Sequence, residues 1–74
     1  MDINNLKQGM KLVLKNPANG YPKDDEKANK LIKRLGKDPI LTIKSVKIEN
    51  WFTWITFEED PSNYYNSVQF ELHN

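Results

Sequence analysis

In the middle of the chain, the apolar residues change from odd to even positions, and this shift limits the fold more than any other feature. Leu41 and Ile43 occupy odd positions, whereas Val46 and Ile48 occupy even ones. Successive side chains of a strand point to opposite faces, so one strand keeps all four on one face only if it contains an extra residue. We therefore predict a β-bulge or a sharp bend at Lys44-Ser45.

The strand that follows supports this bulge. A two-residue turn at Glu49-Asn50, combined with the bulge, sets the apolar residues of the two strands opposite one another, as cross-strand partners require. The same register places Trp51 inside and both Phe52 and Trp54 outside. Strong bending of a short strand lets a few strands close into a small barrel.

Alternation and helical spacing predict the remaining elements. Apolar residues alternate over 10–15 and 67–73, which predicts a first and a last strand. A helix is expected at about residues 25–35, where Asp24 can cap the first amides. The polar stretch 58–66 is expected to be a loop. These elements predict a mostly β fold, a small SH3-like barrel of about five strands, with a long first loop that contains a short helix or helical turn.

Length and composition fit one small domain. The chain has 74 residues, so we expect a single SH3-like barrel domain over residues 1–74. No segment approaches the roughly 20 apolar residues of a membrane span, and the N-terminus does not resemble a signal peptide. We therefore expect a cytoplasmic protein without membrane association.

The sequence does not suggest an enzyme. There is no cysteine, and the one histidine, His73, lies next to the C-terminus. Covalent catalysis needs a nucleophile beside a positioned base, and no such pair is evident. The acidic run Glu58-Glu59-Asp60 is typical of a solvent-exposed loop, and the glycines do not form a phosphate-binding loop. We predict no catalytic residue, no metal ligand and no cofactor.

Charge is unevenly distributed along the sequence. All eleven Lys and Arg residues lie within residues 1–48, whereas residues 49–74 contain five acidic residues and no basic one. Interleaved strands of a small barrel would mix these charges in space, and we favour this interpretation over a basic face.

Five short motifs follow one another along nearly the whole chain: Gly9-Met10-Lys11-Leu12-Val13-Leu14, Leu35-Gly36-Lys37, Leu41-Thr42-Ile43-Lys44-Ser45-Val46, Ile55-Thr56-Phe57-Glu58-Glu59 and Phe70-Glu71-Leu72. In length and layout the chain resembles the YorP family of small SH3-like barrels from phages and prophages. The resemblance implies an SH3-like barrel in the cytoplasm of a bacterial host, and it brings no established activity. The paired-aromatic loop motif of peptide-binding SH3 domains is missing, so binding of proline-rich helices is not implied.

Aromatic and lysine side chains of the second half are the candidate partner-binding residues. They are Phe52, Trp54, Lys44, Lys47, Tyr64 and Tyr65. Exposed aromatic residues flanked by lysine suit a protein interface or a base-stacking surface. Alternatively, the apolar stripe of the helix docks on Phe52 and Trp54 and covers them, and we favour this second arrangement because the stripe must be buried. One of the two tyrosines could equally pack under its loop.

Three functional hypotheses follow. The leading one is a non-catalytic module for protein–protein interaction with a host or phage protein. The alternative is nucleic-acid binding by a small barrel, with Trp54 as a stacking residue. The cations for that alternative would be Lys27, Lys30, Lys33, Arg34, Lys44 and Lys47. The third is self-association, and we expect a monomer or a weak dimer.

Overall fold

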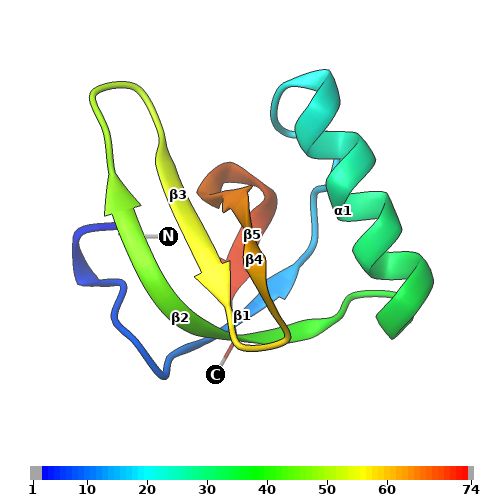
Figure 1. Cartoon of the computed structure of the whole chain (residues 1–74), viewed down its shortest axis with the longest axis horizontal. Helices are drawn as coiled ribbons and strands as arrows, with labels where there is room; N and C mark the ends of the chain where they lie inside the picture. The colour runs from blue at the N-terminus through cyan, green and yellow to red at the C-terminus, as the bar shows by residue number, and fades with distance from the viewer. Residues whose placement is uncertain (1–2, 74) are drawn as a thin grey trace.

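Five antiparallel strands form one sheet in the order β4-β3-β2-β1-β5 (Figure 1). The computed structural model describes residues 3–73. Its elements in chain order are η1 (Ile3–Asn5), β1 (Lys11–Leu14), α1 (Pro22–Leu35), β2 (Ile40–Ile48), β3 (Thr53–Phe57), β4 (Asp60–Asn66), η2 (Ser67–Gln69) and β5 (Phe70–Leu72), where η marks a 3₁₀-helix. The predicted fold class is confirmed, because the protein is mostly β, with one α-helix in a long first loop and a sheet consistent with a small barrel-like fold.

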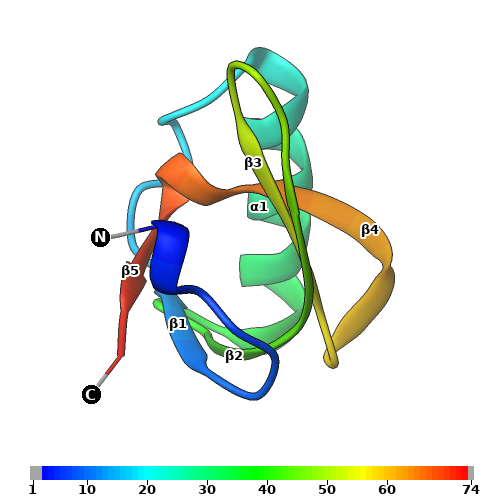
Figure 2. The same cartoon turned by 90° about the vertical axis from the view of Figure 1, so that its left-hand side faces the viewer.

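Strand β2 is long and curved, and it joins the two halves of the sheet (Figures 1 and 2). Its first part pairs with β1, and its second part pairs with β3. Between these parts the register shifts, because Ile43 lies opposite Phe57 while Ser45 lies opposite Thr56, and Lys44 has no partner. The predicted bulge at Lys44-Ser45 is therefore confirmed.

The predicted two-residue turn between β2 and β3 is wrong. Ile48 pairs with Thr53, so a four-residue loop connects the strands, and the Glu49 amide donates to the Phe52 carbonyl across it (2.9 Å). The true register differs from the predicted one by two residues, which preserves the alternation along both strands. Two side chains that were expected inside are nevertheless exposed: Ile48 at the end of β2 (60%) and Trp51 in the loop (89%).

The last third of the chain differs from the prediction in two places. The expected loop 58–66 contains strand β4, which pairs with β3 and forms one edge of the sheet. Pro61 is tolerated there because an edge strand can lack a donor. The expected strand over 67–73 is divided into η2 and the short β5, since the Asn66 side chain accepts a hydrogen bond from the Val68 amide and caps the 3₁₀ turn.

Helix α1 begins earlier than predicted, at Pro22, whose fixed φ and missing N–H suit a first helical turn. Tyr21 occupies the N-cap position. Asp24 is therefore not the cap but the third helical residue, and its carboxylate accepts a hydrogen bond from the Tyr21 amide (2.9 Å). The helix ends at Leu35, and Gly36 forms its C-cap with a φ of 97°, which favours glycine.

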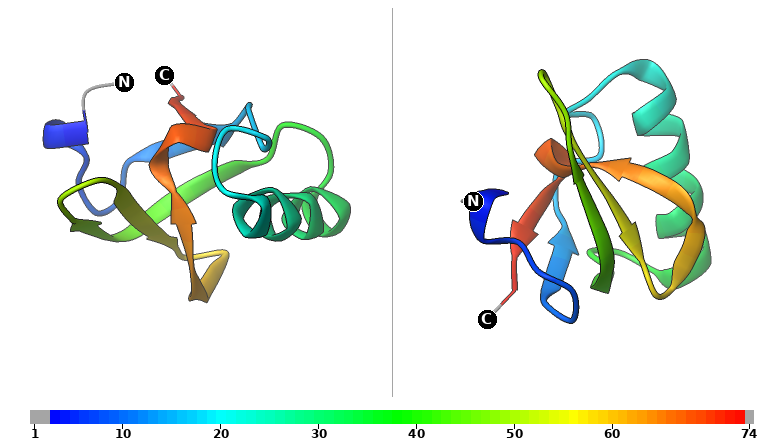
Figure 3. Two further views of the ribbon diagram at one scale, coloured as in Figure 1. Left: turned by 90° about the horizontal axis from the view of Figure 1, so that it is seen from above. Right: turned by 60° about the vertical axis from the view of Figure 1, so that its left-hand side comes forward.

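The helix covers one side of the sheet next to β4 (Figure 3). Ala28 and Leu31 are buried in the same core as the inward side chains of the strands, and Ile32 packs against that core. The apolar stripe therefore completes the barrel core and does not cover Phe52 and Trp54, so the favoured arrangement of the sequence analysis is wrong. The other buried members of the core are Leu6, Leu12, Leu14, Leu41, Ile43, Ile55, Phe57, Tyr65 and Phe70. Within residues 3–73, no helix is long and apolar enough to cross a membrane.

Candidate functional site

The β2–β3 loop and the start of α1 lie at the same end of the molecule (Figures 1 and 2). Aromatic side chains from both segments are in contact there. The ring centroids of Tyr21 and Phe52 are 5.0 Å apart, and those of Phe52 and Trp54 are 5.9 Å apart. Trp51 extends from the loop, and Tyr64 on β4 shares a hollow with Trp54. We call these five residues the aromatic face.

A buried hydrogen-bond network holds the first loop in place behind the aromatic face. Asp24 is 4% exposed, and its carboxylate accepts from the Asn66 side chain (3.2 Å) as well as from the Tyr21 amide. The fully buried Gln69 side chain donates to the backbone carbonyls of Pro17 (2.6 Å) and Asp24 (3.1 Å). Buried polar groups of this kind specify one arrangement, because each lost partner leaves a desolvated group behind.

Gly20 allows this close packing. A Cβ atom at this position would lie 2.8 Å from the Asp24 carboxylate and 2.9 Å from the Asp24 Cβ. Since neither atom has room to move within the buried network, only glycine fits, and the backbone then leads directly into Tyr21. Tyr21, whose ring contacts Phe52, is the next residue along the chain.

Lys47 lies at the edge of the aromatic face. Lys47 lies opposite Trp54 in the β2–β3 register, lines the hollow with Trp54 and Tyr64, and forms an exposed ion pair with Glu49 (3.6 Å). Lys44 is exposed at the bulge and lines neither this hollow nor the one beside Trp51. The structure thus brings together Phe52, Trp54, Lys47 and Tyr64 among the predicted residues, and it leaves Lys44 apart.

Tyr65 is the second predicted residue outside the aromatic face. Its ring is 2% exposed and packs against Phe57 and Phe70, with centroids 5.9 and 6.2 Å away. Its hydroxyl donates a hydrogen bond of 2.5 Å to the Asp60 carboxylate, which also accepts from the Asn63 side chain (3.0 Å). Tyr65 is therefore a core residue with a polar tip, which was the alternative for one of the two tyrosines.

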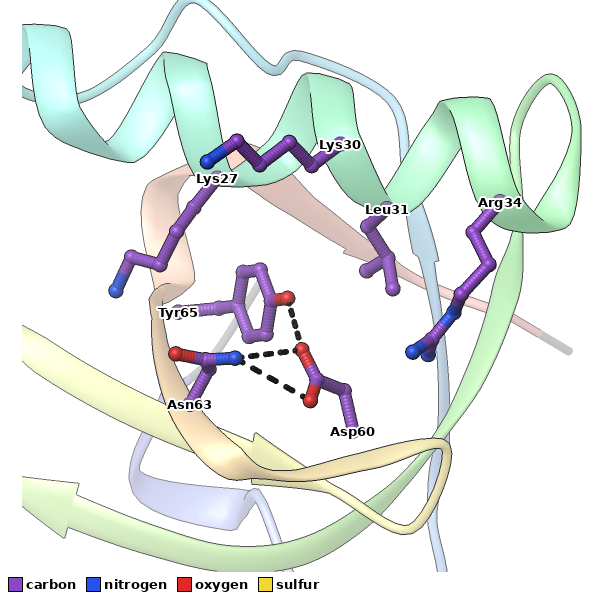
Figure 4. Close-up of a pocket in the computed structure, with 7 residues that line it drawn as sticks. All are labelled: Lys27, Lys30, Leu31, Arg34, Asp60, Asn63 and Tyr65. Carbon is purple, nitrogen blue, oxygen red and sulfur yellow. Dashed lines mark hydrogen bonds between the residues drawn. The ribbon is translucent and has the colours of Figure 1, made fainter.

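The Asp60 carboxylate faces a pocket of about 230 Å³ between α1 and β4, which we call the cationic pocket (Figure 4). Three cations of α1 line it, and their spacing of three and four residues places them on one side of the helix. Lys27 and Arg34 extend from the helix toward β4, and Lys30 lies along the rim. The complete lining is Lys27, Lys30, Leu31, Arg34, Asp60, Asn63 and Tyr65.

Backbone carbonyls fix two of these cations. The Lys27 ammonium donates to the Tyr64 carbonyl and lies 5.4 Å from the centroid of the Tyr65 ring. The Arg34 guanidinium donates to the Glu59 carbonyl (2.6 Å). The acidic last third of the chain therefore meets the basic helix here, as expected if the two charge blocks mix in space.

The environment of the cationic pocket determines how its two acidic groups ionise. Burial raises the pKa of Asp60, but the hydrogen bonds from Tyr65 and Asn63, together with the charges of Arg34 and Lys27, outweigh it and hold the pKa below its ordinary value. Burial raises the pKa of the Tyr65 hydroxyl, and the hydrogen bond to Asp60 and its charge raise it further. Asp60 is thus an ionised acceptor, and Tyr65 a protonated donor, at neutral pH.

Sequence reasoning did not include Tyr21 and Trp51 among the candidate binding residues, and it did not place the helix cations in one pocket with Asp60. Pro22 was a signal, because proline at a first helical position marks a helix start and places Tyr21 at the N-cap. The recurrence of cations at positions 27, 30 and 34 was another, although only the fold reveals Asp60 beside them. Between residues 3 and 73, no three His, Asp or Glu side chains come close enough to hold a metal ion.

Fold and surface together define a small barrel-like β domain that presents an aromatic face and a cationic pocket. Residues 10–74 match the family described as Bacteriophage T4 protein Y07B, and because the match covers most of the chain, the protein belongs to this family. The predicted membership of a phage protein family is confirmed, although the match is to Y07B and does not extend to YorP. No curated protein and no solved structure matches the chain.

Proposed function

We propose that this phage-family protein is a non-catalytic interaction module that binds a host or phage protein through the aromatic face. The observation that carries the proposal is the exposure of Trp51, which is 89% accessible beside the contiguous rings of Tyr21, Phe52 and Trp54. Tryptophan and tyrosine dominate the energetics of protein interfaces because they bury a large apolar area with few rotatable bonds.

The structure behind the aromatic face lowers the cost of binding. A partner must pay for the ordering of side chains and loops that are mobile before contact. Here the buried network around Asp24 and Asn66 fixes the first loop, and a backbone hydrogen bond between Glu49 and Phe52 closes the second. The ion pair of Lys47 with Glu49 supplies the polar rim that usually surrounds an apolar contact area.

Selection from a random-peptide display library tests the proposal. Enriched peptides are measured by fluorescence anisotropy against the wild type, Trp51→Ala and Trp54→Ala. We expect each tryptophan variant to weaken binding by about tenfold or more, the effect of losing an anchor residue at an interface. Leu72→Ala is the matched control, because Leu72 is an exposed apolar residue (44%) on β5, at the opposite edge of the sheet.

Two outcomes would contradict the proposal. One is a set of peptides that the folded tryptophan variants bind as tightly as the wild type does. The other is a selection that enriches no peptide at all. Circular dichroism spectra that match the wild type establish that the variants are folded, and we expect this for Trp51→Ala because the residue contacts solvent on most sides.

Nucleic-acid binding is a second candidate, and one observation favours it. The hollow with Trp54 and Tyr64 contains Lys47, and Lys27 donates to the Tyr64 carbonyl, so cations flank two stacking rings. Anisotropy with single-stranded and double-stranded oligonucleotides at low salt tests this idea. No signal at about 10⁻⁴ M protein would exclude it, because non-specific binders reach roughly 10⁻⁴ to 10⁻⁶ M.

The proposal also includes the SH3-like character of the barrel and a site of action in the bacterial cytoplasm. The strand order, the long first loop and the 3₁₀ turn before the last strand support the first. Membership of a phage protein family supports the second.

A further inference from the structure

We propose that the cationic pocket binds a dianionic phosphate group, either free phosphate or the terminal phosphate of a monoester. This site shares no side chain with the aromatic face. Phosphate binding therefore goes beyond the proposed function and can be tested separately from it. Three features of the pocket support this inference: its charge, the free donors of its cations and the carboxylate of Asp60.

The net charge of the cationic pocket favours a ligand with two negative charges. The pocket contains three cations and one carboxylate, which leaves a surplus of two positive charges. A terminal phosphate carries about −1.5 to −2 charges at neutral pH and therefore matches this surplus. A carboxylate or a phosphodiester carries only one negative charge and would leave a cation unmatched in a partly enclosed site.

The cations retain donors for a ligand. Two ion pairs join described residues, Lys15 with Asp38 and Lys47 with Glu49, and neither involves a cation of the pocket. Lys27 and Arg34 each donate to one backbone carbonyl. An ammonium has three N–H groups and a guanidinium five, so donors remain on both side chains while their positions are fixed. The planar fork of arginine suits two phosphate oxygens, and lysine adds a point charge.

Asp60 already behaves as an anion bound in this pocket. Its carboxylate accepts hydrogen bonds from Tyr65 and Asn63, and no cation lies within ion-pair distance of it among the described residues. The field of Arg34 and Lys27 nevertheless favours its ionised form. A second anion that reaches the free donors of the cations would be repelled by the Asp60 carboxylate. This repulsion lowers the affinity of the site for the anion.

Nuclear magnetic resonance measures this binding directly. The protein labelled with ¹⁵N is titrated at constant ionic strength with inorganic phosphate, glycerol phosphate and dimethyl phosphate. We expect saturable shifts of the Asn63 and Tyr65 amides with the first two, with a dissociation constant of about 1 mM or below, and none with dimethyl phosphate. The first two probes distinguish free phosphate from a monoester as the preferred ligand.

Four variants sharpen the test. Arg34→Gln and Lys30→Gln each remove one charge from the pocket, and Arg34→Gln is expected to weaken binding about tenfold because a charge-assisted hydrogen bond is lost. Lys33→Gln is the matched control, since it removes the same charge from the same helix outside the pocket and should leave affinity within about twofold. Asp60→Asn keeps an acceptor for Tyr65 and should strengthen binding.

Three results would overturn the proposal. The shifts could fail to saturate with phosphate, or Lys33→Gln could weaken binding as much as Arg34→Gln does, which would indicate only the general charge of the helix. Dimethyl phosphate or an oligonucleotide could bind as tightly as phosphate, which would make the pocket a site for a phosphodiester backbone. Dispersed amide spectra of each variant show that the fold is retained, so a loss of binding is not a loss of structure.

Discussion

Tyr64 and Tyr65 are neighbours on β4, yet they belong to two regions that differ in almost every physical respect. Tyr64 is 49% exposed in the aromatic face, whereas Tyr65 is 2% exposed and donates its hydroxyl proton to Asp60 beside the cationic pocket. Consecutive residues of a strand point to opposite sides, so one short segment serves both regions.

The comparison separates side chains that stabilise the fold from side chains that are free to bind. Trp51 and Tyr64 of the aromatic face are exposed, Phe52 and Trp54 are half-buried, and the polar network lies buried behind them. In the cationic pocket, hydrogen bonds join Tyr65 and Asn63 to Asp60, and Tyr65 belongs to the core. Substitution of these bonded groups should therefore change stability, whereas substitution of an exposed ring or an exposed pocket cation should change binding with little effect on stability.

The largest expected effect distinguishes the two tyrosines. Tyr65→Ala should lower the free energy of unfolding by about 3 to 5 kcal/mol, because it removes a buried ring and one of the two side chains that donate to Asp60. Tyr64→Ala should change it by no more than about 0.5 kcal/mol. Urea unfolding followed by tryptophan fluorescence measures both. Equal losses in the two variants would show that the aromatic face is part of the core.

An intermediate effect is expected in the network behind the aromatic face. Asp24→Ala removes the acceptor for the Tyr21 amide and the Asn66 side chain, and the unsatisfied groups should cost about 1 to 3 kcal/mol. Freed from this anchor, the Tyr21 ring should move relative to Phe52, which near-ultraviolet circular dichroism detects. Asp25→Ala is the control, since Asp25 lies next in the helix and its carboxylate accepts a hydrogen bond from the exposed Asn29 side chain, outside the buried network. A near-ultraviolet spectrum that Asp24→Ala leaves unchanged would contradict a positioning role for the network.

The smallest effect concerns pH. Because the pKa of Asp60 in the folded protein lies below its ordinary value of 3.8, the ionised carboxylate stabilises the fold above the pKa of the unfolded chain. This contribution is lost as the pH falls through the lower, folded-state pKa. We therefore expect Asp60→Asn to be less stable than the wild type at pH 7, and the difference to shrink in acid below about pH 4. Urea unfolding at several pH values measures it, and a difference that grows in acid would have the wrong sign.

The elements that could be predicted are those whose signal is local. The odd-to-even shift around Lys44 identified the bulge, and helical spacing with Gly36 identified α1 to within a few residues at its start. Strand β4 could not be recognised, because an edge strand with Pro61 and mostly exposed residues lacks the alternation of a half-buried strand. Its pairing depends on β3, and pairing partners are not visible in a local pattern.

Part of the aromatic face could also be predicted, because the direction of a strand side chain is a local property. The outward direction of Trp54 depends only on strand periodicity, which a register error of two residues does not disturb, whereas Phe52 lies in the loop before β3. The exposure of Trp51 depends on the length of a loop, and a four-residue loop leaves the same alternation as a two-residue turn. Asp60 and Arg34 are distant in the sequence, and only the packing of α1 against β4 brings them to one pocket.

Strand β2 takes part in both halves of the sheet, and this has a consequence for how the chain can vary. An inserted residue in β2 would displace the ladders on both sides of the bulge, so neither half could compensate for the other. The tip at Glu58 is also tied to β2, because its amide donates to the Thr42 carbonyl (2.9 Å). The tip at Asn50 carries no such double constraint and is the place where length can change. We expect relatives of this protein to diverge in size at Asn50 while the strand Ile40–Ile48 keeps its residue count.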